Sequence, residues 1–169
     1  LVKAGAFDNF VDNRQSLYDS IPSLILKSKN IFENKLVNQT NLFEEEGIIE
    51  RVQKTIAPYL KSRWRELIKH PLVGEARILG MLGAIELSPE PETRAPFKEA
   101  AGTIGLITSE ICIKNGLIMR HVYDKMIISP PLIINKEQID DLISLVWRCL
   151  DEAEAKIRRD GLMVVGKKS

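Results

Sequence analysis

The sequence predicts an α+β fold for residues 47–169, with a small, mainly antiparallel sheet covered by helices, and a helical N-terminal fragment for residues 1–46. Two observations lead to this prediction. Apolar residues recur at helical spacing in three segments of the larger part. Pairs of short, strand-forming runs with tight connections lie between those segments, so the helices should pack on one small sheet.

The first helix of the larger part is predicted at about residues 48–67, where apolar residues line one face at a spacing of about 3.6. Pro58 lies inside this pattern, and a proline within a helix removes a hydrogen bond and clashes one turn back, so we expect a kink or break near Ala57. His70-Pro71 should end the element, because the residue before a proline disfavours α geometry.

Residues 73–87 then read as two strands, in which Gly80 and Gly83 allow a bend or a close backbone approach. The prolines and charges of residues 88–96 predict a loop. An amphipathic helix should follow at Phe97–Asn115, with Gly116 as its C-terminal cap. Its predicted inward residues are Ala101, Ile104, Ile107, Ile111 and Cys112.

The stretch Leu117–Ser129 predicts a second pair of strands, joined by a short link at Tyr123-Asp124-Lys125. Pro130 and Pro131 cannot donate to a sheet ladder and should end the second strand. Arg120 lies between the two apolar runs of this stretch. A guanidinium carried there could bind a carboxylate or phosphate in a bidentate manner, and the alternative is an ordinary exposed strand arginine.

The last helix is predicted at residues 136–159, because Asn135 with Gln138 forms a capping-box-like start. Acidic residues follow at the positive end of the helix dipole, basic residues crowd the other half, and Gly161 ends the helix. Its buried stripe is predicted to contain Ile139, Leu142, Ile143, Val146, Cys149, Leu150, Ala153 and Ile157.

The composition is that of a globular protein, with 44% apolar and 28% charged residues. A net charge of +1 gives no bias toward nucleic acid or an anionic membrane. No apolar run approaches the roughly 20 residues that span a bilayer, and no signal-peptide pattern opens the chain. These features predict a cytoplasmic protein with no membrane partner, and they disfavour nucleic acid as a partner.

The cysteines and histidines indicate no catalytic residue and no metal site. Cys112 and Cys149 lie among apolar residues of predicted helices, which favours buried thiols over a disulfide. His70 and His121 lie far apart in the sequence without metal-ligand spacing around either. His121 follows Arg120 in a predicted strand and should point to the opposite face.

Five motifs, in this order and at this spacing, resemble the C-terminal part of class III (omega-amino acid–pyruvate type) pyridoxal-phosphate aminotransferases. The likeness covers about residues 47–161. The matching pieces are His-Pro-Leu-Val-Gly-Glu at 70–75, the strand Gly80–Leu87, Gly-Leu-Ile-Met-Arg at 116–120, Pro-Pro-Leu-Ile-Ile at 130–134 and Glu-Gln-Ile-Asp at 137–140.

The resemblance implies that Arg120 is the mobile arginine that pairs with the carboxylate of the substrate or keto acid. It also implies a homodimeric parent enzyme whose cofactor, pyridoxal phosphate, is held by a lysine of the large domain. No lysine of this chain lies in that motif, so we expect no cofactor binding and no activity from this chain alone. This chain departs from the family at two turns. The family usually has Gly-Asp where this chain has Tyr123-Asp124. It also usually has a glycine where this chain has Ile78, which predicts a strained turn at Ile78.

Residues 1–46 resemble another protein. The opening LVKAGAFD, followed by an Asn-Arg helix, is similar to a helical piece of the bacterial DNA polymerase III alpha subunit. The two resemblances meet at Glu46-Gly47 without a linker, which predicts a fusion. Three interpretations stay open: the remnant of an aminotransferase, a polymerase-related interaction fragment, and a non-functional fusion that merely folds.

Overall fold

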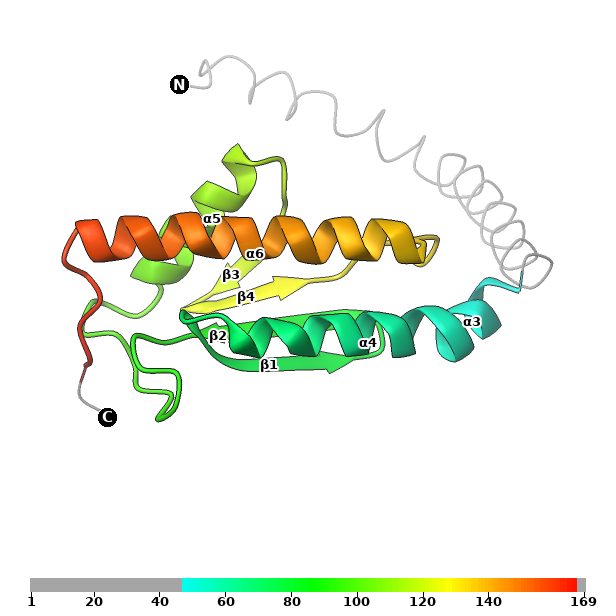
Figure 1. Cartoon of the computed structure of the whole chain (residues 1–169), viewed down its shortest axis with the longest axis horizontal. Helices are drawn as coiled ribbons and strands as arrows, with labels where there is room; N and C mark the ends of the chain where they lie inside the picture. Colours follow the sequence, from blue (N-terminus) through cyan, green and yellow to red (C-terminus); the bar gives the residue numbers. More distant parts are fainter. Residues whose placement is uncertain (1–46, 167–169) are drawn as a thin grey trace, which may run out of the picture. The chain divides into compact units, whose positions relative to one another are not determined.

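A computed structural model of the protein describes residues 47–166. The helical fragment predicted for residues 1–46 lies outside the described residues. The described part contains four strands and a set of helices that cover one face of the sheet (Figure 1). None of the helices in this part is long and apolar enough to cross a membrane.

The first predicted helix exists, but it consists of four helical pieces in succession. These are α3 (Ile48–Arg51), a π-helical turn η1 (Val52–Ile56), α4 (Ala57–Arg65) and a 3-10 turn η2 (Glu66–Lys69). The π turn ends where Ala57 donates its backbone N–H to the carbonyl of Val52. The predicted irregularity near Ala57 is therefore confirmed, because Pro58 in the first turn of α4 cannot donate a helical hydrogen bond. His70 is extended, which confirms the predicted end.

The sheet has the strand order β1-β2-β4-β3, and every pair is antiparallel. The strands are β1 (Val73–Leu79), β2 (Leu82–Leu87), β3 (Arg120–Val122) and β4 (Lys125–Ile128), so the predicted α+β class and both strand pairs are confirmed. The turn between β1 and β2 lies at Gly80, which has a φ of +57°. The prediction of a strained turn at Ile78 is wrong, because Ile78 is an ordinary strand residue paired with Gly83.

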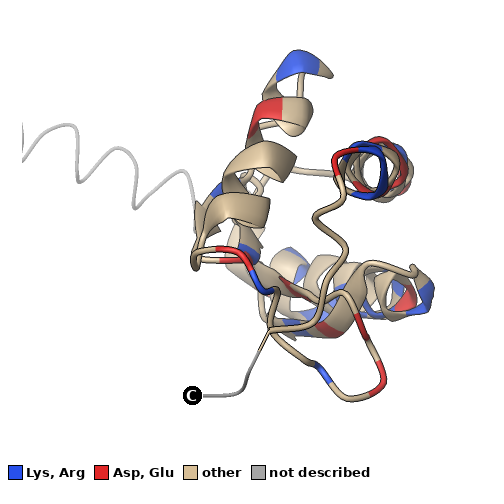
Figure 2. Ribbon diagram, turned by 90° about the vertical axis from the view of Figure 1, so that its left-hand side faces the viewer, with Lys and Arg blue, Asp and Glu red and all other residues tan. Residues whose placement is uncertain are grey.

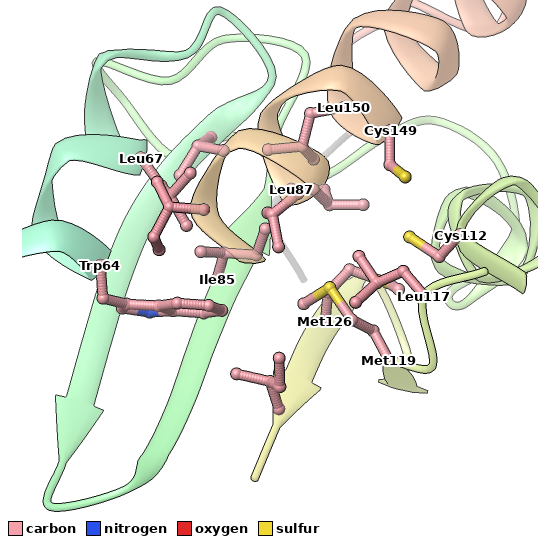
Figure 3. Packing of buried hydrophobic residues seen from close by; sticks show 14 of the residues in the cluster. Trp64, Leu67, Ile85, Leu87, Cys112, Leu117, Met119, Met126, Cys149 and Leu150 are labelled. Carbon is pink, nitrogen blue, oxygen red and sulfur yellow. The ribbon is translucent and has the colours of Figure 1, made fainter. Parts of the chain in front are cut away.

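One face of the sheet is covered by helices and forms the core. Ile85, Met126 and Ile128 lie on this face and belong to a core cluster with residues of α4, α5 and α6. Figure 3 shows Ile85 and Met126 within this packing. Gly83 allows α4 to approach closely, since a Cβ there would lie 2.8 Å from the ring of Trp64. The opposite face carries charged residues in ion pairs, such as Glu86 with Lys125.

Helix α5 (Thr103–Lys114) begins six residues later than the predicted Phe97. The reason is a long-range contact: Phe97 bridges to Val165, and the backbone N–H of Lys98 donates to the carbonyl of Val164. This pairing holds the segment extended, and Ala101, predicted to point inward, is exposed.

The prediction that this helix is amphipathic is also wrong. Its only charged residues are Glu110 and Lys114, and its outer side exposes Leu106 and Ile113. Figure 2 shows few charges along α5 and many around α6, which is seen end on. Gly116 ends α5 as predicted: it has a φ of +80°, and Leu117 donates its N–H back to the carbonyl of Cys112.

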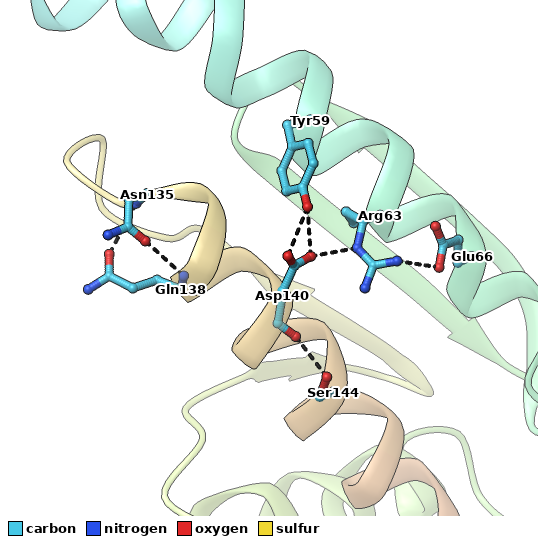
Figure 4. A network of polar contacts seen from close by, with 7 residues as sticks. All are labelled: Tyr59, Arg63, Glu66, Asn135, Gln138, Asp140 and Ser144. Carbon is cyan, nitrogen blue, oxygen red and sulfur yellow. Dashed lines mark hydrogen bonds and ion pairs between the residues drawn. The ribbon is translucent and has the colours of Figure 1, made fainter.

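Helix α6 (Lys136–Arg159) begins with the predicted capping box. Asn135 accepts from the backbone N–H of Gln138 at 2.8 Å, and Gln138 accepts from that of Asn135 at 3.0 Å (Figure 4). Gly161, with a φ of +73°, follows the end of the helix. The predicted stripe is buried except for Leu142, which is half-buried.

Candidate functional site

Arg120, the site residue predicted from the sequence, is the first residue of the edge strand β3. It pairs with Ile127 of β4 and is exposed. Its guanidinium makes no hydrogen bond or ion pair with any residue in the part of the chain that the structure describes. The group is therefore available to an anion from outside.

Arg120 lines an open groove of about 730 Å³, which we call the Arg120 groove. Three segments form it: the chain before β3, the chain after β4, and the first half of α6. Its lining residues are Gly116, Leu117, Ile118, Arg120, Ile127, Ile128, Ser129, Pro130, Pro131, Ile134, Gln138, Asp141, Leu142 and Leu145.

The chemistry of the Arg120 groove suits a small carboxylate. Most of the lining is aliphatic, and Arg120 is its one cationic residue. A guanidinium binds a carboxylate through two parallel hydrogen bonds, and nearby apolar surface strengthens that attraction by excluding water. The one acidic residue of the lining, Asp141, forms no ion pair with Arg120.

The groove offers no group for a Schiff base. Its lining contains no lysine, histidine or cysteine, and a Schiff base needs a lysine amine. The described residues also contain no group of three or more His, Cys, Asp or Glu side chains that could hold a metal ion. What the arrangement offers is a guanidinium beside an aliphatic surface, which suits the binding of an anion.

Contacts with α5 fix the hairpin that carries Arg120. Asp124, in the turn between β3 and β4, accepts hydrogen bonds from the backbone N–H groups of Ile104 at 3.1 Å and Gly105 at 3.0 Å. It thereby caps the first turn of α5, whose own N-cap residue, Gly102, has no side chain to do so. Tyr123 adopts a φ of +51° at this turn, where the resemblance predicts a glycine.

A second contact holds the segment just before Arg120. Ser109 of α5 donates its hydroxyl to the carbonyl of Met119 at 3.2 Å, and both residues are buried. The hairpin is thus tied to α5 at its turn and at the residue that precedes Arg120. Sequence reasoning missed the role of Asp124; the available signal was a helix start without a capping side chain.

The two histidines have separate environments, and His121 lies on the sheet face opposite to Arg120, as predicted. His121 pairs with Met126 on the covered face, opposite to Arg120, and its Nδ1 atom is buried without a partner among the described residues. His70 is 1% exposed; its Nδ1 accepts from the N–H of Leu72, and its Nε2 lies 3.1 Å from Asp151. These contacts join the start of β1 to α6, which is a structural role.

Cys112 and Cys149 are free and buried, which confirms the prediction. Figure 3 shows their sulfur atoms facing each other between α5 and α6. Burial, and secondarily the neighbouring Cys149 thiol, raises the pKa of Cys112 to about 12. A thiol with so high a pKa stays protonated at neutral pH and is a poor nucleophile.

No protein-family model matches the chain. The putrescine–pyruvate aminotransferase of Pseudomonas aeruginosa is 51% identical over 116 residues, which are 69% of this chain and 25% of that protein. A probable gamma-aminobutyrate transaminase 3, mitochondrial, of Oryza sativa subsp. indica is 31% identical over 121 residues, which are 72% of this chain and 23% of that protein.

Solved structures show the same similarity. An omega transaminase from Pseudomonas jessenii in complex with PMP matches with a TM-score of 0.63 and 31% identity, over 69% of this chain and 25% of that one. A structure described as a transaminase with L-ala matches with a TM-score of 0.67 and 29% identity, over 72% and 28%. The chain spans about a quarter of the length of the relatives that it matches. The likeness of residues 1–46 to a polymerase subunit stays a prediction.

Proposed function

We propose that residues 47–161 are the C-terminal portion of a pyridoxal-phosphate-dependent class III aminotransferase that moves an amino group from an omega-amino donor to a keto acid such as pyruvate. The support is the 51% identity to a protein named for putrescine and pyruvate. The remaining three quarters of such a protein would supply the cofactor lysine and the phosphate-binding groups. We further propose that the parent enzyme is a cytoplasmic homodimer.

Within this function, Arg120 binds the carboxylate of the keto acid or amino acid substrate. One observation carries this assignment: an exposed guanidinium without a partner among the described residues lines an aliphatic groove at the edge of the sheet. A carboxylate would neutralise the charge, and the aliphatic lining would exclude water from the pair. The rest of the substrate would extend toward the cofactor in the large domain.

The test is a chimera in which residues 47–166 replace the corresponding part of a complete aminotransferase of this class. The graft begins at 47 so that it includes the helix whose Trp64 packs on the sheet. It ends at 166 so that it includes Gly166, which donates its backbone N–H to the carbonyl of Pro96. In an active chimera, Arg120→Ala should lower kcat/KM for carboxylate-bearing substrates roughly ten- to hundred-fold, the effect of losing a charge-assisted pair worth about 1.5–3 kcal/mol.

Two controls make the test specific. Amines without a carboxylate should keep nearly their full rate in their own half-reaction. Arg148→Ala removes an equal charge from the exposed side of α6 and should change neither rate. Equal losses for both substrate types would show that Arg120 supports the fold or the dimer and does not bind the substrate.

The 169-residue chain alone should show no transamination above free pyridoxal phosphate when it is mixed with an amine donor and pyruvate. Turnover by the chain would contradict the proposal that it is only part of an enzyme. An inactive but folded chimera would instead favour one of the other interpretations. These are a non-functional fusion, or a polymerase-related interaction fragment in which residues 1–46 carry the function and the rest has none.

A further inference from the structure

Arg51, at the end of α3, makes a contact that links two distant parts of the chain. Its Nη2 atom donates to the carbonyl of Leu132 at 2.8 Å, and its Nη1 atom donates to the carbonyl of Ile134 at 3.2 Å. Both acceptors lie in the loop 129–135, between β4 and α6. Arg51 is half-buried, so the guanidinium is partly withdrawn from water where it makes these bonds.

This loop forms one wall of the Arg120 groove, to which it contributes Ser129, Pro130, Pro131 and Ile134. The loop has few hydrogen bonds of its own. The ladder of β4 ends at Ile128, and the two prolines have no N–H to donate. Its internal backbone bond runs from the N–H of Ile134 to the carbonyl of Pro131 at 3.1 Å. Arg51 therefore supplies two of the bonds that fix the path of this wall.

A separate polar network fixes the opposite wall. Tyr59 and Arg63 of α4 both donate to the carboxylate of Asp140 in α6, and the Arg63 bond is 2.7 Å long (Figure 4). That network places the first half of α6, which carries Gln138 and Leu142 of the groove. Its hydrogen bonds do not reach the loop 129–135. The end of that loop is held to α6 by the capping box at Asn135, and Arg51 holds its middle at Leu132 and Ile134.

We propose that Arg51 is a positioning residue of the carboxylate site. It does not line the Arg120 groove, but its two hydrogen bonds hold the loop 129–135, which lines the groove together with Arg120. This inference rests on the proposed role of Arg120. It predicts that the affinity of the groove for a carboxylate depends on a residue 69 positions away in the sequence from the arginine that binds it.

The experiment uses the full 169-residue chain and sodium pyruvate as the probe, with binding followed by the shifts of backbone amides in an NMR titration. The variants are Arg51→Gln, Arg51→Lys, Arg120→Gln and the matched control Arg65→Gln, which removes the same charge from an exposed position of α4 that has no partner among the described residues. Hydrogen exchange of the Ile134 amide reports on the order of the loop.

Arg51→Gln should weaken pyruvate binding roughly three- to ten-fold, the range expected when a residue acts through its neighbours. It should also speed exchange at Ile134 by roughly ten-fold, while core amides of α6 keep their protection. Arg51→Lys keeps the charge and one donor nitrogen, so it should restore part of the pyruvate affinity and part of the protection of the Ile134 amide. Arg65→Gln should match the wild type in both measurements.

The outcomes separate this inference from the proposed function. If Arg120→Gln abolishes binding but Arg51→Gln does not weaken it, Arg51 only stabilises the fold and the inference is wrong, while the assignment of Arg120 stands. Equal weakening by Arg65→Gln would show a general charge effect and would also overturn the inference. If the wild type binds no pyruvate, or Arg120→Gln binds it equally well, both assignments fall.

Discussion

Asp124 gives the sharpest stability test, because a single carboxylate joins the hairpin that carries Arg120 to the start of α5. Asp124→Ala removes both hydrogen bonds to the N–H groups of Ile104 and Gly105. Loss of a capping side chain costs about 0.5–2 kcal/mol, and loss of a negative charge at a helix N-terminus costs about 0.3–1 kcal/mol more. We expect a total of about 1–2 kcal/mol, since the two effects overlap.

For a domain of this size, that loss corresponds to a Tm lower by about 4–8 °C. Asp124→Asn keeps an oxygen that can accept the same hydrogen bonds but removes the charge, so it should lose only about 0.3–1 kcal/mol. The measurement is urea unfolding followed by circular dichroism, with the slope of the transition required to stay constant. Glu99→Ala is the control, because Glu99 is an exposed acid shortly before α5.

Two results would refute the reasoning. Asp124→Ala within about 0.3 kcal/mol of the wild type would mean that solvent replaces the cap at no cost. Equal losses for Asp124→Ala and Asp124→Asn would mean that the charge, and not the hydrogen-bond acceptor, connects the hairpin to α5. In that case, a loss for Glu99→Ala of similar size would identify the helix dipole as the cause.

Two further predictions follow from the packing and the charges of the described part. Gly105→Ala should destabilise the chain by about 1–3 kcal/mol in urea unfolding, because the added Cβ would overlap the carbonyl oxygen of Tyr123. This loss is expected even though alanine favours a helix more than glycine does. Unchanged or higher stability would contradict the prediction. Hydrogen bonds from Tyr59, and then from Arg63, lower the pKa of Asp140 below its usual value. Its stabilising contribution is therefore complete above about pH 4, the pKa in the unfolded chain, and is lost as the pH falls through the lower folded value. Asp140→Asn should be less stable than the wild type at pH 7 and equal to it well below pH 3; a constant difference at every pH would exclude this linkage.

Local sequence signals predicted the elements that local interactions determine. The capping box at Asn135, the glycine after α5 and the end at His70-Pro71 all act within a few residues, so their patterns can be read directly. The strand pairs were predictable for the same reason, because short connections bring neighbouring runs together. The start of α5 was not, since the pairing of Phe97 with Val165 joins segments far apart in the sequence.

In the candidate site, too, the local feature was predictable from the sequence and the long-range feature was not. Arg120 was predicted as a site residue from its motif, and its place at the start of an edge strand agrees with the pattern of apolar runs around it. The groove could not be predicted, because it needs the side chains of α6 to face the loop after β4. Leu142 was predicted as a core residue, and the structure shows it half-buried and lining the groove. The spacing of apolar residues identifies the apolar face of a helix, but it does not distinguish residues that pack in the core from residues that line a groove.

The contacts that shape the Arg120 groove come from elements that precede Arg120 in the sequence and from elements that follow it. Arg51 precedes Arg120 and fixes the loop wall, while Asp140, held by α4, follows it and fixes the α6 wall. Asp124 and Ser109 join the arginine's own hairpin to α5. The motif around residue 120 therefore predicts the charged group of the candidate site, while the groove beside that group depends on the fold of residues 47–166. For this reason a protein that keeps the motif but loses the helix at 48–65 should bind carboxylates poorly, even with Arg120 intact.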